Sequence, residues 1–474
     1  MKQGLWLLMC LLLTACAVGP NYRAPVTSLE KYHWSTHSNQ MVTAFVERQW
    51  WQQLADPQLS KYVEAIAFEN LDVAIACKRL LQARSLQMMD YARGGPKVIG
   101  KASVTNEEIS RTGRILGLFA NANNPLFNNI ALNRKVYQPG FDASWEIDVF
   151  GQNFRRNQQR SAQTAAASFT VDDTIRLIRA EIARSYIQLR ATQKKIDITQ
   201  KNIALQKQTL TITRQRLEAG STNELDVALT DSQLKETEAL LPRFQGEAFH
   251  QASLIAILMG KAPGQMAKQL LNTYSMPKIP KKVAVGVPSD LLRRRPDIIA
   301  AERNIAATTA AIGVAVADLY PKFNLVANYS LESIALKTLW NRNSSVWTLG
   351  PFMQWSLFQS GQVHANINLS QAQQEEAVLQ YKKTVLSALQ EAESSIQQLK
   401  QSQQTTYQYL NAVAANQHAV KLARQRYREG EDDILSVIQS QQGLLRSELN
   451  AIDAQAASLI QLVSVYKAVG GGWV

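Results

Sequence analysis

The hydrophobic pattern of this chain is dominated by two long stretches in which apolar residues recur every seven positions. Neither residues 152–219 nor residues 362–429 contain glycine or proline, so each stretch offers 68 uninterrupted residues. The apolar line of the first stretch is Ile175, Ile182, Leu189, Ile196, Ile203, Leu210 and Leu217. A period of seven predicts helices with a left-handed supercoil, and a helix of this length would extend about 100 Å.

A second line, three residues after the first, is small or polar almost throughout. In the first stretch it holds Ser185, Thr192, Thr199, Gln206 and Thr213. A free two-stranded coiled coil prefers leucine at such positions. The pattern therefore indicates helices packed side by side in a wall with one face in water. Periodicity alone leaves a plain long coiled coil as an alternative.

The chain is a tandem duplication. The segment RQRLEAGSTNELDV starts at Arg214, and its counterpart RQRYREGEDDILSV starts at Arg424. The same offset of 210 residues holds without insertion from Trp145 to Gly260, whereas further upstream the offset is 225. The first copy therefore carries a longer loop before Trp145. The two repeats are residues 46–275 and residues 280–474.

Each repeat is expected to end in a helical hairpin. Gly220 follows the first long stretch and Gly430 follows the second, and glycine readily adopts the left-handed conformation that stops a helix. The chain then continues through a second helical stretch that ends at Gly260 in one repeat and at Gly470 in the other. The hairpin tips are therefore expected near residues 220 and 430.

Four segments are expected to be strands, two in each repeat. They are about residues 97–107, 136–148, 322–332 and 346–357. Their lengths are close to that of a tilted membrane strand. Four strands cannot close a membrane barrel, and lipid does not tolerate open sheet edges, so membrane strands would require several protomers to share one barrel. Soluble β-hairpins are the alternative. The expected fold class is mainly α with a small β part.

The first residues predict export and lipidation. Residues 1–15 combine Lys2, a short apolar run and small residues, which is the pattern of a secretory signal peptide. Leu13-Thr14-Ala15-Cys16 is similar to a bacterial lipobox. In such signals the cysteine becomes the first mature residue and carries a covalent lipid such as palmitate, which would anchor an extension spanning residues 16–45. An ordinary signal peptide cleaved nearby is the alternative.

Composition argues against several classes of protein. The net charge is +13, but the basic residues are scattered along the helical stretches and no nucleic-acid motif appears, so no nucleic-acid partner is expected. No catalytic motif is present and the five histidines form no metal-ligand pair with cysteine or carboxylates, so no enzyme activity, metal or other cofactor is expected. Cys77 is expected to pack as a small apolar residue.

Several motifs resemble those of one family. CAVGPNYRAP begins at Cys16, WEIDVFGQNFRR begins at Trp145, and VPSDLLRRRPDIIAAERNIAATTAAIGVAVADLYPKFNL covers residues 287–325. Together these segments resemble the TolC-like outer-membrane efflux factors, specifically the lipoprotein branch of NodT or OprM type. The resemblance covers nearly the whole chain.

This resemblance implies a homotrimer in the outer membrane of a Gram-negative bacterium. Three copies would close a shared β-barrel of about twelve strands, and their long helices would form a hollow periplasmic α-barrel. The hairpin tips would dock with a periplasmic adaptor, which links the channel to an inner-membrane transporter of the resistance–nodulation–division type. The protein would be a passive exit duct in multidrug or other efflux. An outlet for type I protein secretion, or an anchored coiled coil without a pore, are the alternatives.

The resemblance also implies roles for residues at the two tips. The candidates for adaptor docking are Arg214, Leu217, Gly220, Arg424, Tyr427 and Gly430. Asp432 and Asp433 are candidates for a periplasmic gate, and the alternative is that they only begin a helix, where negative charge is favourable. Gln439 stands where the family often has aspartate, so the polar network of the gate is expected to be thinner.

Overall fold

The computed structural model describes residues 17–25, 41–42, 49–108, 110, 133–272, 275–280 and 282–473. The predicted lipid site Cys16 and the signal peptide lie outside these residues. The chain divides into two compact units. The strand unit comprises Met1–Ala24, Gln82–Thr164 and Arg303–Val378. The hairpin unit comprises Pro25–Leu81, Ala165–Glu302 and Leu379–Val474.

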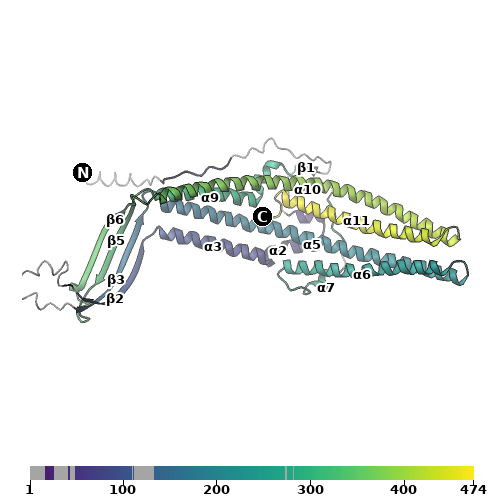
Figure 1. Cartoon of the computed structure of the whole chain (residues 1–474), viewed down its shortest axis with the longest axis horizontal. Helices are drawn as coiled ribbons and strands as arrows, with labels where there is room; N and C mark the ends of the chain where they lie inside the picture. The colour runs from purple at the N-terminus through teal and green to yellow at the C-terminus, as the bar shows by residue number, and fades with distance from the viewer. Residues whose placement is uncertain are drawn as a thin grey trace, which may run out of the picture. The chain divides into compact units, whose positions relative to one another are not determined.

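The strand unit contains one antiparallel sheet with the order β2-β3-β5-β6. The strands are β2 (Lys97–Glu108), β3 (Asn133–Ile147), β5 (Lys322–Leu331) and β6 (Ser345–Gln354). Strands from the two repeats pair directly, because Trp145 of β3 lies opposite Leu325 of β5. Figure 1 shows the four strands side by side, with β2 and β6 at the two edges. Many apolar side chains on this sheet are exposed in the single chain, among them Val98 and Trp347.

The observed strands differ from the expected ones mainly at two ends. β3 begins three residues before the expected position, because residues 133–135 still pair with β2. β6 ends at Gln354 rather than at residue 357. There the chain leaves the ladder, and the Trp355 indole instead donates a hydrogen bond to the carbonyl of Leu319 at 3.1 Å. A two-residue parallel pair, β1 (Met41–Val42) with β4 (Val283–Ala284), was not expected.

Long helices make up most of the described chain. They are α2 (Pro57–Glu69), α3 (Leu71–Arg93), α5 (Gln152–Glu218), α6 (Glu224–Leu258), α9 (Pro296–Ala317), α10 (Gln362–Glu429) and α11 (Ile434–Ala468). The short helices are η1 (Trp50–Leu54), α7 (Ala267–Leu270), η3 (Pro288–Asp290), α8 (Leu291–Arg294) and η4 (Arg342–Ser344). α5 has 67 residues and α10 has 68, which confirms the two uninterrupted helices expected from the sequence.

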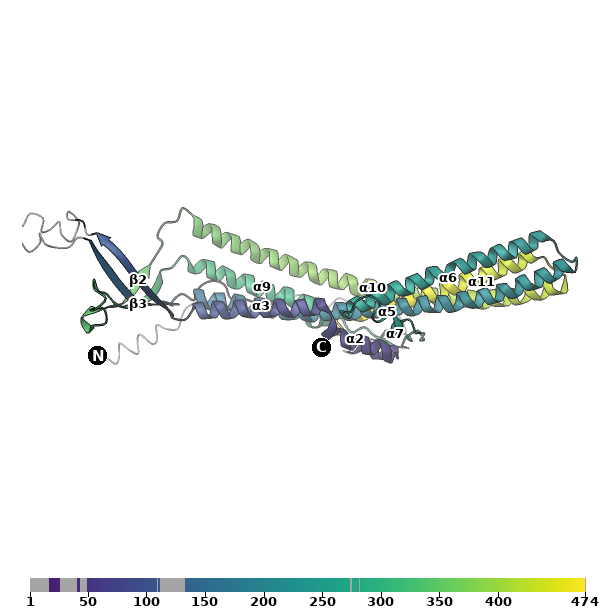
Figure 2. The ribbon, with the colours of Figure 1, turned by 90° about the horizontal axis from the view of Figure 1, so that it is seen from below.

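In the hairpin unit, α5 packs against α11 in antiparallel orientation. Asn202 donates to Glu448 at 2.8 Å. About two turns further along α5, the Thr209 hydroxyl accepts a hydrogen bond from the Gln441 amide at 2.9 Å. Gln442 of α11 also donates to Gln233 of α6. Figures 1 and 2 show α5, α6, α10 and α11 running together to two loops at one end. The second polar line of the heptad pattern is buried at Ser185, Thr192 and Thr199, so it belongs to these helix contacts.

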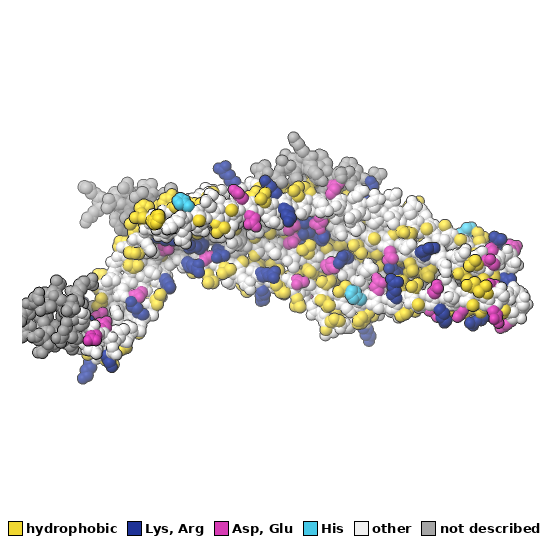
Figure 3. All heavy atoms as spheres, in the orientation of Figure 1, with side chains coloured by type: hydrophobic (Ala, Val, Ile, Leu, Met, Phe, Trp, Pro, Cys, Tyr) yellow, Lys and Arg dark blue, Asp and Glu magenta, His cyan; other side chains and the backbone are white. Residues whose placement is uncertain are grey.

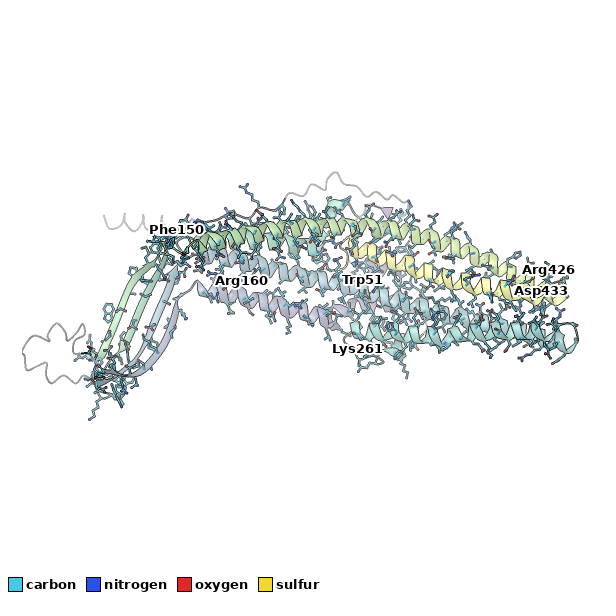
Figure 4. All side chains as sticks on the ribbon, viewed as in Figure 1. Trp51, Phe150, Arg160, Lys261, Arg426 and Asp433 are labelled. Carbon is cyan, nitrogen blue, oxygen red and sulfur yellow. The ribbon has the colours of Figure 1, made fainter. Side chains whose placement is uncertain are left out.

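A buried cluster of aromatic and charged side chains lies at the other end of these hairpins. Trp50 stacks on Tyr466 with ring centroids 5.5 Å apart, and the Arg179 guanidinium lies 4.9 Å from the ring centre of Trp51, which Figure 4 labels. Large rings fill such a site and dominate its burial energy. Because η1 and α11 contribute these rings, the cluster joins the start of the first repeat to the end of the second.

An ion-pair network centred on Arg295 lies within the hairpin unit. Arg295 is 4% exposed and contacts Asp297 and Glu391, each at 2.7 Å. Lys467 also reaches Glu391, at 2.7 Å. Burial alone would raise the pKa of Asp297 and of Glu391, but their basic partners outweigh it and hold each pKa below its ordinary value. The network links α9, α10 and α11.

The expectation for Cys77 is wrong. Its side chain is exposed in the single chain. The buried stripe of α3 passes through Val73 and Ala76. Cys77 follows Ala76 and points about 100° further around the helix, away from that stripe.

Candidate functional site at the hairpin tips

Both hairpin tips are closed by the same glycine-dependent helix stop. Gly220 has a φ of 68°, and its N–H donates to the carbonyl of Leu217 at 2.9 Å. Gly430 has a φ of 81° and donates in the same way to Tyr427 at 3.2 Å. The N–H of Ser221 donates to the carbonyl of Arg216 at 2.8 Å, and the N–H of Glu431 donates to the carbonyl of Arg426 at 2.9 Å. This pair of bonds defines the Schellman motif, so both predicted tips are confirmed as helix ends.

Side chains cap the helix that leaves each tip. The Asn223 side chain accepts a hydrogen bond from the backbone N–H of Asp226 at 3.0 Å, and Asp433 accepts one from Ser436 at 3.0 Å. Asp432 accepts a bond from the Ser436 hydroxyl, also at 3.0 Å. The alternative left open for Asp433, that it begins a helix, is therefore what its geometry shows. Figure 4 labels Asp433 at the start of α11.

Arg216 joins the two tips. Arg216, at the end of α5, donates a hydrogen bond to the backbone carbonyl of Tyr427 on α10. Its guanidinium carbon also lies 4.5 Å from the centre of the Tyr427 ring, which is a cation–π geometry. The Tyr427 hydroxyl reaches back to Thr213 of α5 at 3.4 Å. We call this set of interactions between Arg216, Tyr427 and Thr213 the tip contact.

Apolar packing surrounds the tip contact. Tyr427 is 4% exposed and packs with Ile434, Val437 and Ile438, and Ile212 of α5 lies against this cluster. Tyr427 was proposed from the resemblance as a docking residue, but here its ring is enclosed between the two hairpins. The sequence analysis did not identify Arg216. Arg216 belongs to the repeated Arg-Gln-Arg segment, but nothing in that segment distinguishes Arg216 from Arg426.

The duplicated counterpart of the tip contact has different chemistry. Arg426 corresponds to Arg216, and Leu217 corresponds to Tyr427, at the offset of 210 residues. Arg426 lies 3.8 Å from Glu431 and 3.7 Å from Asp432, both in its own loop, and its side chain is 57% exposed. Leucine offers no aromatic face to a guanidinium. The two arginines therefore have different partners although their local sequences match.

The remaining predicted docking residues lie on or near the surface of the tips. A Cβ added at Gly220 would meet no atom within 4 Å. The Arg214 side chain is 60% exposed and lies 4.0 Å from Asp231. Burial, together with the nearby charge of Arg428, lowers the pKa of Arg424. Figure 3 shows acidic and basic side chains gathered at this end of the molecule.

A shallow, open groove runs along α10 just before the second tip. It has a volume of about 570 Å³ and is lined by Gln417, Val420, Lys421, Arg424, Gln425, Arg428 and Glu429. Three of these side chains are basic, so the groove carries a positive field that would attract an acidic partner segment. The groove includes Arg424, which was a candidate for docking.

Within the described part of the chain, no three histidine, cysteine, aspartate or glutamate side chains converge as they would around a metal ion. None of the described helices is long and apolar enough to cross a membrane.

The chain matches the family model described as "Outer membrane efflux protein" over residues 64–260 and 287–471. It is 28% identical to Nodulation protein T of Rhizobium leguminosarum bv. viciae over 454 residues, which cover 95% of this chain and 88% of that protein. It is also 28% identical to the pyoverdine export outer membrane protein OpmQ of Pseudomonas aeruginosa over 470 residues, covering 98% and 95%.

Solved structures agree with this assignment. The outer-membrane channel OprN superposes with a TM-score of 0.86 at 30% identity, covering 97% of this chain and 100% of that one. The family model is described by efflux, OpmQ by pyoverdine export and OprN as an outer-membrane channel, which favours efflux over type I protein secretion and over a coiled coil without a pore. The chain belongs to the outer membrane efflux protein family, and it is an efflux channel of the Gram-negative outer membrane that extends into the periplasm.

Proposed function

We propose that this protein is the passive exit duct of a tripartite pump, in which three copies join a periplasmic adaptor and an inner-membrane transporter of the resistance–nodulation–division type. The observation that carries this proposal is the four-stranded sheet with two unpaired edges, β2 and β6, in a chain built from two joined helical hairpins. Lipid does not tolerate unpaired strand edges, and four strands are too few to close a barrel. Three copies would pair every edge.

The internal duplication predicts which helices meet between copies. Within one chain, α5 pairs with α11 through Asn202–Glu448 and Thr209–Gln441. Moving α5 forward by 210 residues gives α10, and moving α11 back by 210 residues gives α6. If the second hairpin of one copy meets the first hairpin of the next in the same register, Ala412 will face Glu238 and Ala419 will face Asp231.

Cysteine cross-linking tests both the trimer and this register. We expect the double variant Ala419→Cys with Asp231→Cys, in a Cys77→Ser background, to form covalent dimers and trimers under mild oxidation. Thr209→Cys with Gln441→Cys should cross-link only within one chain. Ala419→Cys with Glu224→Cys is the off-register control, since seven residues displace the thiol by about 10 Å. A trimeric mass in detergent without cross-links would refute the register, whereas a monomeric mass would refute the trimer.

We propose that Cys16 carries a covalent lipid anchor and that the adaptor docks at the tips around Gly220, Gly430, Arg214, Leu217 and Arg424. The exposed tip glycines and the basic groove on α10 support docking of a partner with acidic and small side chains. Since Tyr427 is enclosed in the tip contact, its role in docking would be indirect. We assign no single substrate to the channel.

Gly220→Asp tests the docking proposal. A side chain at Gly220 would project into open space, so we expect trimers to assemble normally while export activity falls by about tenfold or more, the loss produced by about 1.4 kcal/mol of docking energy. Gly264→Asp is a matched control, because Gly264 also has a positive φ and no atom within 4 Å of an added Cβ. Efflux assays in cells would compare the two variants. Equal export by both would contradict docking at this tip.

We propose that Asp432 and Asp433 narrow the periplasmic entrance through their charge and their contacts with Ser436 and Arg426. The double variant Asp432→Asn, Asp433→Asn removes both charges, and asparagine retains helix-capping ability. We expect conductance in planar bilayers to rise about twofold or more, as expected if weak ion pairs of about 0.5 kcal/mol hold the entrance closed. Unchanged conductance would show that these residues only start the helix.

A further inference from the structure

The first described residues of the chain are bound by other residues of the strand unit, and we call this binding site the seat. We call residues 17–21 the strap. The Arg155 side chain, on the first turn of α5, is 3% exposed. Its Nε donates to the carbonyl of Val18 at 2.9 Å, and its Nη2 donates to the carbonyl of Gly19 at 3.1 Å. The same Nη2 reaches the carbonyl of Ala17 at 3.3 Å and the side-chain oxygen of Asn21 at 2.9 Å.

Close backbone contacts complete the seat. A Cβ at Gly19 would lie 2.5 Å from the Cα of Gly313 on α9, and a Cβ at Gly313 would lie 2.8 Å from the Cγ of Arg155, so neither position has room for a side chain. A Cβ at Gly151 would lie 2.7 Å from the Cα of Ala17. The N–H of Val18 also donates to the carbonyl of Phe150 at 3.2 Å. The strap therefore contacts both α5 and α9, one helix from each repeat.

The charge of Arg155 makes this contact favourable. All its acceptors are neutral oxygens, and apart from the nearby side chain of Gln158 at 2.9 Å they all belong to the strap. A buried guanidinium that loses its hydrogen-bond partners is strongly destabilised. If the strap left its seat, Arg155 would keep a single one of these bonds. The buried charge of Arg155 therefore obtains most of its hydrogen bonds from the bound strap.

The second repeat serves as an internal comparison. At the offset of 210 residues, Arg155 corresponds to Ala365 and Gly151 corresponds to Gly361; at the offset of 225, Gly313 corresponds to Met88. A Cβ at Gly361 would meet no atom within 4 Å, and Met88 is 67% exposed. Among the described residues, the seat is therefore built at one of two equivalent places, which argues that it serves the strap and is not a by-product of the repeated fold.

We propose that Arg155, Gly151 and Gly313 form a binding site for the first residues of the processed chain, and that this site fixes where the lipid-bearing N-terminus stands on the strand unit. The site recognises an extended peptide whose successive carbonyls face one guanidinium and whose third residue is glycine. Nearby, the Phe150 and Tyr320 rings stack with centroids 4.6 Å apart. Phe150 follows the end of β3 and Tyr320 precedes the start of β5. Figure 4 labels Phe150 there.

The lipid anchor would consequently be held close to the end of β3 and the start of β5, and would not lie at the end of a flexible linker. Ala17 is the residue directly after Cys16, so a lipid on Cys16 would leave the protein within one residue of the seat. This part of the inference rests on the proposed lipidation of Cys16. The docking of the strap itself does not depend on the lipid.

A nitroxide spin label at position 23 can test the docking. Arg23 is exposed and lies two residues after the strap. Arg23→Cys in a Cys77→Ser background would be labelled in the purified full-length trimer in detergent. We expect an immobilised spectrum when Arg155 is present and loss of the immobilised component in Arg155→Ala, because chain ends that are not tied down move on the nanosecond timescale.

Two variants make the result decisive. Arg156→Ala is the matched control, since Arg156 bonds Asn153 at 2.8 Å and not the strap, and it should leave the spectrum unchanged. Gly19→Val changes only the strap and should release it without disturbing the helices. A label that stays immobilised in both Arg155→Ala and Gly19→Val would overturn the proposal. Intact mass reports separately on the lipid, so an unmodified Cys16 would refute the anchor and leave the strap result standing.

Discussion

The variant Arg216→Ala should open the periplasmic entrance of the channel. Arg216 joins the two hairpins through the carbonyl and the ring of Tyr427. Near the tips, its removal leaves apolar packing and two long hydrogen bonds, one between Tyr427 and Thr213 and one from Arg424 to Gln208, each at 3.4 Å. A charged hydrogen bond together with a cation–π contact contributes about 2 kcal/mol. We expect the open probability in planar bilayers to rise by about tenfold or more, since tenfold corresponds to about 1.4 kcal/mol.

The duplication supplies the control for this experiment. Arg426→Ala removes the sequence counterpart, whose ion pairs at 3.7 and 3.8 Å are exposed and lie within one loop. Such pairs contribute little, so this variant should change the open probability by less than about threefold. Tyr427→Leu introduces the residue found at the corresponding place in the first tip and should act like Arg216→Ala. Equal conductance in wild type and Arg216→Ala would show that the tip contact does not hold the entrance closed.

The variant Arg295→Ala should strongly destabilise the hairpin unit. It removes the shared partner of Asp297 and Glu391 and a hydrogen bond to the carbonyl of Ala468 at 3.0 Å. Removing one member of a buried ion pair typically costs about 3–5 kcal/mol, because the remaining charges stay desolvated. We expect a clearly lower midpoint of thermal unfolding, followed by circular dichroism in detergent. Arg293→Ala, at an exposed position two residues earlier, should change the midpoint little.

The pH dependence of unfolding provides a second measurement on the same network. The pKa of Asp297 and that of Glu391 are lowered in the folded protein, so the folded state binds fewer protons at these groups than the unfolded chain does. Their stabilising contribution is present above the ordinary carboxyl range and is lost as the pH falls through the lowered values. Arg295→Ala should flatten this acid dependence. An equally steep acid dependence in the variant would contradict the assignment.

Much of the architecture follows from local sequence signals. Gly220 and Gly430 end uninterrupted helices, and the repeat offset alone placed both hairpin tips. Strand ends were less accurate, because the partner strand decides where pairing stops: β6 ends at Gln354, which lies opposite Lys322, the first residue of β5. Cys77 was placed wrongly because composition cannot tell which side of α3 meets a neighbour.

The candidate site depended more on tertiary structure. Matching segments around Arg216 and Arg426 gave no reason to separate the two arginines, yet one joins the hairpins and the other pairs within its loop. Arg216 and Tyr427 lie more than 200 residues apart in sequence, and only the packing of α5 beside α10 brings them together. Arg155 is similar, because it bonds carbonyls of the strap that lie more than 130 residues away in sequence.

The sequence by itself determined the features that arise from short-range chemistry. These are the heptad period, the glycine helix stops, the alternating strand segments and the duplication, since each is set by residues a few positions apart or by direct repetition. The tertiary structure alone decided which side chains meet across the repeats. Burial removes water from Arg155 and Arg295, and Arg216 is half-buried. Each of the three bonds a carbonyl oxygen from a distant segment, so these partners are a property of the folded chain.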